Sequence, residues 1–341
     1  MSKKLMIVGG TGFLGYYSAL EALKKGYKVA SLSLDDINLE GWYPKEIDVH
    51  YGDVFEMSEE ELTELFKGFD YLIYSVGPDD RVTPKAPSYD FFHERLVVHP
   101  TRLFTAARKA GVKKAVVFNS YFATFDRLYP EKKIGERHPY VKCRLEQAKS
   151  LIEAGGDEME VVVLELPYIF GAMPERTPLW KDVFVERFFK GKFVFFPKGG
   201  TTMIHVKHIG EAAIGALENG KGGERYPIGD LNESFDYMLK AFCDGLHTKK
   251  VICHAGKRIA AWGANQFVAK PEAKKGNQAG LDFKYLMLDI MSEKMYIPEE
   301  EIERTSKLLG YGRGGVYEGI IEAMEKAYPN GYPEKKAKKS E

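Results

Sequence analysis

The sequence of 341 residues predicts an α/β protein with a doubly wound parallel sheet and a smaller, interleaved C-terminal cap. Three observations carry this prediction. Apolar strand-like runs alternate with helical segments through the first half of the chain, a glycine-rich turn follows the first run, and helical patterns dominate the C-terminal part. A chain of this length can bury a large core.

The predicted strands are short apolar runs bounded by turn residues. A helix at about 13–25 stops at Gly26, Ser58 and Glu61 form a capping box before a second helix, and a third helix stops at Gly111. Such alternation is typical of a parallel sheet covered on both faces. The runs are Leu5–Val8, Val29–Leu34, Asp48–Tyr51, Tyr71–Ser75, Ala115–Phe118 and Val161–Leu166.

The glycine-rich turn joins the first strand to the first helix. Gly9 permits a sharp turn, the absent side chain at Gly12 admits a phosphate, and Gly15 lets the helix approach the sheet. The N–H groups at the helix start, at Phe13 and Leu14, would face that anion. This strand–turn–helix context predicts the pyrophosphate site of a dinucleotide-binding Rossmann domain.

The regular alternation of strand-like and helical segments is lost after Gly171. A strand at about 203–206, a helix at 210–217 and a strand at 225–228 precede helices at about 234–246, 280–291, 299–309 and 316–327. We therefore expect residues 1–171 to form the Rossmann domain, with 201–230 returning to it. Residues 172–200 and 231–332 would form the substrate cap, and 333–341 a disordered tail.

Charge and cysteine content exclude several classes of function. The chain has 49 basic residues (Lys and Arg) and 49 acidic residues (Asp and Glu). Its formal net charge is therefore zero, which gives no general attraction to nucleic acid or to an anionic membrane. The three cysteines are far apart, which indicates reduced thiols. No apolar run approaches the ~20 residues of a membrane span, and no signal peptide fits before the first strand. We expect a cytoplasmic protein with a small-molecule substrate and no nucleic-acid or membrane partner.

Four further segments follow the glycine-rich turn in order: Gly52–Val54, Asp70–Gly77, Leu166–Gly171 and Ile204–His208. With them the chain resembles the extended short-chain dehydrogenases/reductases of the NAD-dependent epimerase/dehydratase family. The resemblance implies an NAD(P)-dependent oxidoreductase or epimerase acting on a carbonyl or hydroxyl carbon, with a nucleotide sugar as substrate and a homodimer as assembly. It implies these cofactor contacts: Asp53 and Val54 at the adenine, Val76 and Gly77 at the ribose, Pro167 and Ile169 at the nicotinamide.

The family's Tyr-x-x-x-Lys pair matches Tyr140 and Arg144 in this chain. Residues four apart share a helix face, so both side chains would point to the cofactor. The resemblance implies that Tyr140 transfers the proton and that Arg144 holds the ribose, although a guanidinium differs from the usual ammonium.

The family hydroxyl after the fifth strand falls on Tyr121, with Ser120 one place earlier. Three alternatives stay open at this position. Ser120 could face the cofactor while Tyr121 supplies a phenolic donor, the site could be degenerate, or Tyr121 could only pack under the cap.

The end of the second strand bears on the choice between NAD and NADP. An acid there takes the ribose hydroxyls of NAD, whereas a basic residue accepts the extra phosphate of NADP. Ser33 stands at the family's acid position, but Asp35 lies about 20 residues after the last glycine, where the general fingerprint expects an acid. With Asp36 beside it and no Lys or Arg in the turn, the sequence favours NAD.

Two alternative functions remain. A reductase of a less polar carbonyl compound would use the aromatic residues that crowd the segment from Trp180 to Phe196. A non-catalytic NAD(P)-binding sensor or interaction protein would explain the altered serine and lysine positions. His205 and His208 lack a Cys or acid at ligand spacing, so we expect no metal site.

Overall fold

The computed structural model describes residues 3–333, and its main sheet has seven parallel strands in the order β10-β6-β5-β4-β1-β2-β3. The strand order reverses beside β1, which places a crevice at the carboxyl ends of β1 and β4. The predicted doubly wound sheet is confirmed. Its strands are β1 (Lys4–Val8), β2 (Lys28–Ser33), β3 (Asp48–Tyr51), β4 (Tyr71–Tyr74), β5 (Lys114–Ser120), β6 (Glu160–Leu166) and β10 (Arg225–Pro227).

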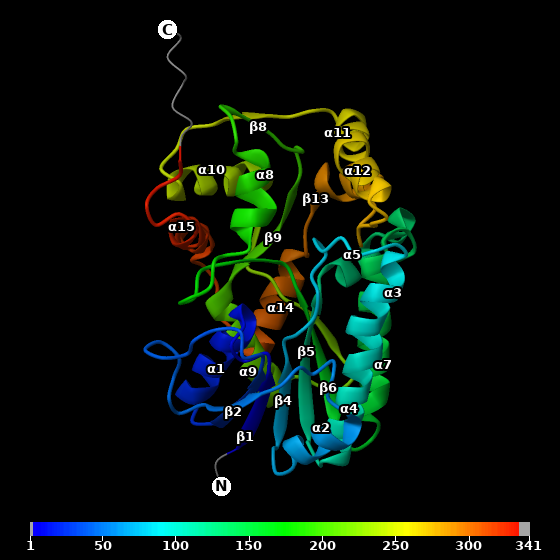
Figure 1. The fold of residues 1–341 in the computed structure, drawn as a ribbon, viewed down its shortest axis with the longest axis vertical. Coiled ribbons are helices and arrows are strands. Elements are labelled where there is room, and N and C mark those ends of the chain that lie inside the picture. The colour runs from blue at the N-terminus through cyan, green and yellow to red at the C-terminus, as the bar shows by residue number, and fades with distance from the viewer. Residues whose placement is uncertain (1–2, 334–341) are drawn as a thin grey trace.

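Helices cover both faces of this sheet (Figure 1). They are α1 (Phe13–Lys24), α2 (Glu59–Phe66), α4 (His99–Lys109), α7 (Pro139–Gly155) and α9 (Val206–Asn219). α1 and α9 pack on one face against side chains such as Ile7 and Leu164, whereas α2, α4 and α7 pack on the other against Met6 and Val163. Successive side chains of a strand point to opposite faces, so the same strands supply both layers.

Local signals set the helix ends as the sequence predicts. The Ser58 hydroxyl accepts from the Glu61 N–H, and the Glu61 carboxylate accepts from the Ser58 N–H, which completes the capping box of α2. Gly26 and Gly111, which follow α1 and α4, have φ values of +78° and +91°. Glycine adopts this left-handed conformation without steric cost.

Shorter elements surround the carboxyl end of the sheet. α3 (Ser88–His93) continues through a π-helical turn (Glu94–Val98) into α4, and the segment after β5 forms α5 (Phe122–Leu128), a 3-10 turn (Pro130–Lys132) and α6 (Ile134–Arg137). Among residues 3–333, no helix is long and apolar enough to cross a membrane.

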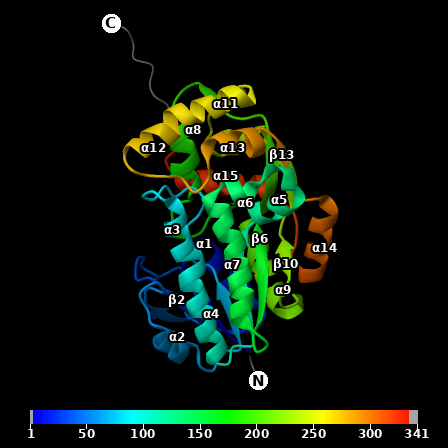
Figure 2. The same ribbon diagram turned by 90° about the vertical axis from the view of Figure 1, so that its right-hand side faces the viewer.

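A cap covers this end of the sheet (Figures 1 and 2). One small sheet runs β11-β9-β13 with β7 paired to β9, and another joins β8 to β12. The strands are β7 (Tyr168–Phe170), β8 (Phe193–Phe195), β9 (Gly200–His205), β11 (Leu231–Ser234), β12 (Val251–Cys253) and β13 (Lys294–Met295). The helices are α8 (Glu186–Phe188), α10 (Phe235–Gly245), α11 (Lys257–Ala264), α12 (Lys270–Lys274), α13 (Phe283–Tyr285) and α15 (Val316–Ala327), with π-helical turns at Lys181–Val185, Asn265–Ala269 and Leu286–Met291.

Two elements pack against a different part of the molecule from the one to which the expected domain division assigns them. β9 pairs within the cap sheet, although residues 201–230 are expected to return to the Rossmann domain. α14 (Glu299–Leu309) packs against α9 and β10, although 231–332 are expected in the cap (Figure 2). Apart from Pro333, the expected tail lies outside the described residues.

Candidate active site

A cavity of about 430 Å³ opens between the carboxyl ends of the central strands and the cap. Many of the residues singled out from the sequence converge on it, because strands β1, β4, β5 and β6 all end at this edge of the sheet. The predicted site residues that line it are Phe13, Leu14, Val76, Gly77, Ser120, Tyr121, Tyr140, Arg144, Pro167 and Ile169.

The glycine-rich turn has the shape that a pyrophosphate requires. Gly9 adopts a φ of +86°, and a Cβ at Gly15 would lie 2.1 Å from the Gly9 carbonyl oxygen, so the helix start is packed tightly on the turn. A Cβ at Gly12 would meet only that same oxygen, at 3.2 Å, and the first turn of α1 has no side-chain cap. The open space at Gly12 and the uncapped N–H groups therefore fit the phosphates of a dinucleotide.

The residues expected at the adenosine lie outside this cavity, at the ends of β2 and β3. Asp53 is exposed and its carboxylate accepts from the Phe55 N–H at 2.9 Å, while Val54 is buried beside it. Asp35 is exposed, and its side chain forms no hydrogen bond or ion pair with any other residue in the range 3–333. Its neighbour Asp36 instead pairs with Arg176 from the cap, a contact that the sequence did not indicate.

The pair at the start of α7 faces the cavity. Arg144 Nε donates to Tyr140 Oη at 2.9 Å, because residues four apart lie on one helix face. Arg144 Nη1 also donates to the Phe118 carbonyl oxygen at 3.2 Å and to Gln147 Oε1 at 2.9 Å, which fixes the guanidinium below the cavity. Burial raises the pKa of Tyr140, and the nearby Arg144 charge opposes that rise.

Ser120 and Tyr121 both line the cavity but differ in what their hydroxyls do. Tyr121 Oη is 2.9 Å from Thr201 Oγ1 in β9, and its ring packs on Phe122 and Phe125. Ser120 Oγ accepts from the Phe122 N–H at 3.3 Å. This bond leaves the hydroxyl hydrogen of Ser120 to donate elsewhere.

Three charged residues that sequence analysis missed, Asp79, Asp80 and Arg81, also line the cavity. Arg81 Nη1 is 3.1 Å from Asp79 and 3.7 Å from Asp80, and its guanidinium lies 4.9 Å from the Trp180 ring centre. Burial raises the pKa of Asp80, although Arg81 opposes this. Their sequence signal was their position a few residues after the fourth predicted strand.

A second cavity of about 990 Å³ adjoins the first, because Asp80 and Arg81 line both. Two further cations, Arg187 and Lys190, lie in its wall. Most of the remaining lining is apolar: Phe188, Phe195, Phe196, Ile259, Phe267, Val268, Leu281, Phe283, Leu286 and Met287.

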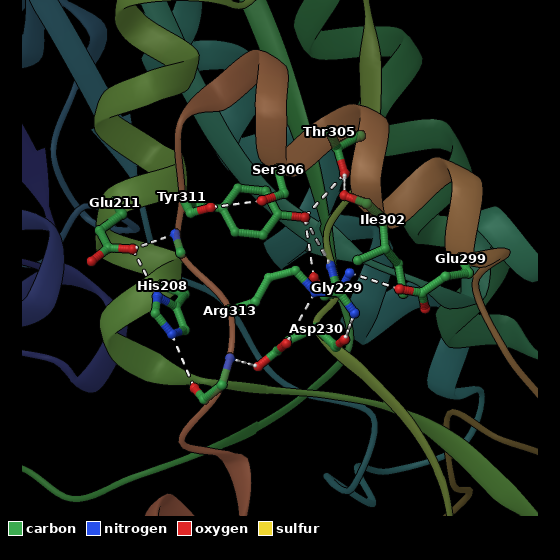
Figure 3. A network of polar contacts seen from close by, with 12 residues as sticks. His208, Glu211, Gly229, Asp230, Glu299, Ile302, Thr305, Ser306, Tyr311 and Arg313 are labelled. Atoms are coloured by element: carbon green, nitrogen blue, oxygen red, sulfur yellow. Dashed lines mark hydrogen bonds and ion pairs between the residues drawn. The ribbon is translucent and has the colours of Figure 1, made fainter.

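His205 at the end of β9 and His208 in α9 both form hydrogen bonds with neighbouring protein groups. His208 Nε2 donates to the Gly314 carbonyl oxygen at 3.0 Å, and its Nδ1 lies 2.7 Å from Glu211 Oε2, within a network that continues to Asp230 and Arg313 (Figure 3). This network ties α9 to the segment before α15. Within residues 3–333, no group of three or more His, Cys, Asp or Glu side chains could hold a metal ion.

Comparisons with known proteins identify the family. Residues 5–229 match the NAD dependent epimerase/dehydratase family. The chain belongs to this family. It is also 24% identical over 270 residues to a decarboxylating sterol-4-alpha-carboxylate 3-dehydrogenase of Dictyostelium discoideum, covering 73% of this chain and 77% of that protein. The enzyme of that name from Mus musculus is 22% identical over 228 residues, covering 63% of this chain and 59% of its own length.

Solved structures of other proteins show the same fold. The crystal structure of gox2253 has a TM-score of 0.73 and 17% identity, covering 96% of this chain and 98% of its own. UDP-glucose 4-epimerase from Bifidobacterium longum, in complex with NAD+ and UDP, has a TM-score of 0.66 and 16% identity, covering 97% and 100%. As a member of an NAD-dependent family, the protein is an oxidoreductase or epimerase of the short-chain dehydrogenase/reductase type, and its cofactor is NAD.

Proposed function

We propose that this family member interconverts a secondary alcohol and a ketone on a large, mostly apolar compound. The observation that carries the proposal is the second cavity, whose lining is mostly aromatic and aliphatic and which adjoins the Tyr140 cavity at Asp80 and Arg81. Ligand sites lined in this way bury apolar surface and use a few polar groups for orientation. The sterol dehydrogenase names of the sequence relatives support the same substrate class.

In this proposal the predicted cofactor residues keep their roles. The turn at Gly9, Gly12 and Gly15, with the N–H groups of Phe13 and Leu14, would hold the pyrophosphate. Asp53 and Val54 would meet the adenine, Val76 and Gly77 a ribose, and Pro167 and Ile169 the nicotinamide. Asp35 would meet the adenosine ribose beside Asp36. When bound, NAD supplies or accepts a hydride at its nicotinamide.

The chain's own residues would then move the proton. Tyr140 would give its phenolic proton to the carbonyl oxygen in reduction, or take it from the hydroxyl in oxidation. Arg144, 2.9 Å from that phenolic oxygen, would stabilise the phenolate and donate to the ribose. Ser120 would donate its hydroxyl hydrogen to the reacting oxygen. Tyr121, already bonded to Thr201, would shape the cavity floor.

A nucleotide sugar is the second candidate substrate. Arg187 and Lys190 line the second cavity, and neither forms an ion pair among residues 3–333. Two free cations could receive the diphosphate of such a substrate. One protein of the same fold, MoeE5, has been solved in complex with UDP-glucose and with UDP-glucuronic acid, which supports this alternative.

A substrate panel distinguishes the two candidates. Purified protein with NAD+ would be offered a hydroxysteroid such as dehydroepiandrosterone, a long-chain secondary alcohol, and UDP-glucose, with NADH formation as the readout. We expect turnover with an apolar alcohol. Met287→Glu, which places a charge in the second cavity, should raise KM strongly, whereas Leu308→Glu on exposed α14 should not. Turnover of UDP-glucose alone would reject the proposal.

Three finer expectations belong to this proposal as well. A division into a Rossmann part and a substrate cap is supported by the first cavity, which residues of both parts line. A cytoplasmic location suits three unpaired cysteines. A homodimer suits the family resemblance, and light scattering of the purified protein would test it.

A further inference from the structure

An ion pair joins the cap to the loop that follows β2, beside the glycine-rich turn. Arg176 Nη2 and Nη1 lie 3.0 and 3.2 Å from the two carboxylate oxygens of Asp36. Arg176 Nε donates to the carbonyl oxygen of Thr11, in the glycine-rich turn, at 3.0 Å. We propose that Asp36 sets the preference for NAD over NADP by holding Arg176, the cation that could otherwise receive the extra phosphate of NADP.

The position of the pair connects it with the adenosine ribose. In doubly wound folds the pyrophosphate lies on the glycine-rich turn, and the residue that contacts the ribose 2′-hydroxyl follows the second strand. Arg176 contacts both regions at once, through Thr11 and Asp36. An arginine near this point is the usual receptor of the 2′-phosphate in NADP-binding proteins.

The segment that carries Arg176 is anchored on both sides. Tyr17 Oη donates to the Ala172 carbonyl oxygen at 2.7 Å, and Trp180 Nε1 donates to the Ile169 carbonyl oxygen at 2.9 Å. Arg176 also lines the Tyr140 cavity. The guanidinium is therefore held at the cofactor groove by its own segment, and the loss of one partner at Asp36 would leave it there.

The Asp36–Arg176 pair would discriminate between NAD and NADP because of the charge of the extra phosphate. A guanidinium that already donates to a carboxylate through two nitrogens cannot use the same two donors to bind a phosphate. The ribose phosphate, with about two negative charges, would have to displace Asp36 and would then face two acids, Asp35 and Asp36. The 2′-hydroxyl of NAD carries no charge and needs no such displacement.

Substitution of Asp36 tests this directly. Asp36→Asn keeps the size of the side chain and removes its charge, so Arg176 becomes available to a phosphate. We expect the Kd of NADPH to fall by about tenfold or more, with little change for NADH. Titration of the fluorescence of each reduced cofactor against the full-length protein measures both constants without turnover.

Glu40→Gln is the matched control. It removes one carboxylate charge from the same loop after β2, but Glu40 is exposed and does not pair with Arg176. We expect it to change the ratio of the two dissociation constants by less than about threefold, since exposed charges without close contact are screened. Adding Arg176→Met to Asp36→Asn should abolish the gain in NADPH binding, because the receptor is then missing. Asp36→Ser provides a second variant should the asparagine variant not fold.

Three results would overturn the inference. They are a wild-type protein that binds NADPH more tightly than NADH, equal effects of Glu40→Gln and Asp36→Asn, and a gain that survives Arg176→Met. Because the measurement uses only cofactor, it is independent of the proposed substrate. A panel that rejects apolar alcohols would leave these dissociation constants unchanged.

Discussion

The phenolic oxygen of Tyr140 accepts a hydrogen bond of 2.9 Å from Arg144 Nε. Both side chains are nearly buried, so the guanidinium acts on the phenol with little screening by water. The rest of the guanidinium is fixed by the Phe118 carbonyl oxygen and by Gln147. Arg144 thus occupies a set position beside the tyrosine.

Removal of the Tyr140 hydroxyl tests its role in proton transfer. We expect Tyr140→Phe to lower kcat by about 10²–10⁴-fold, since only the transferable proton is lost. The Kd of NADH should change little. Full activity of this variant, together with loss in Ser120→Ala or Tyr121→Phe, would place the proton donor at the end of β5.

Substitution of Arg144 separates charge from geometry. Arg144→Lys keeps the positive charge and should retain activity, whereas Arg144→Met should weaken both NADH binding and kcat. Lys142→Met, on the same helix, is the control, because Lys142 is absent from the cavity lining. Equal losses in Arg144→Met and Lys142→Met would argue against a specific role for Arg144.

The raised pKa of Tyr140 predicts different pH profiles for the two reaction directions. Burial raises this pKa above its usual value of about 10, and Arg144 only partly opposes the rise. Oxidation needs the phenolate, so kcat/KM for the alcohol should rise with pH toward pH 10. Reduction needs the phenol and should stay level across neutral pH. A plateau of the oxidation profile near pH 7 would contradict this assignment.

Local patterns in the sequence predict most of the Rossmann part. Continuous apolar runs, the Gly9–Gly15 turn and the capping box at Ser58 each act within a few residues, so each can be recognised without knowledge of the fold. The Tyr140 and Arg144 pair is local too, because helix geometry alone brings them together.

Contacts between distant segments escape such analysis. Arg176 and Asp36 are 140 positions apart, and nothing near either residue in the sequence indicates the other. The same holds for Tyr121 and Thr201, whose hydrogen bond depends on how β9 pairs in the cap.

One predicted helix starts later than expected. The helix predicted at 280–291 begins at Phe283, because the Asp282 carboxylate accepts from the N–H groups of the first turn.

Two glycines of the turn should respond differently to a side chain. A Cβ at Gly12 would meet only the Gly9 carbonyl oxygen at 3.2 Å, so Gly12→Val should fold yet lose dinucleotide binding. A Cβ at Gly15 would lie 2.1 Å from that oxygen and 2.9 Å from Gly10 Cα, so Gly15→Val should cost at least about 1–3 kcal/mol of stability. Thermal unfolding and calorimetric titration with NADH measure the two effects. Unchanged NADH affinity in Gly12→Val would remove the pyrophosphate assignment.

His138, directly before α7, should make the protein sensitive to mild acid. Burial lowers its pKa to about 4; Asp282 and Asp289 oppose this, while Arg137 adds to it. Its Nδ1 accepts from the Asp282 N–H at 2.9 Å, which requires the neutral ring. The unfolded chain takes up a proton near pH 6.5, so the folded state loses up to about 3 kcal/mol as pH falls from 6.5 to 4.

His138→Asn offers an oxygen to the same N–H and has no proton to gain, so its unfolding free energy should fall less over this pH range than that of the wild type. His247→Asn is the control: His247 is exposed with a φ of +50°, a conformation that asparagine tolerates. Chemical denaturation at pH 7 and pH 4.5 measures both. If His247→Asn removed as much acid sensitivity as His138→Asn, burial of His138 could not be its cause.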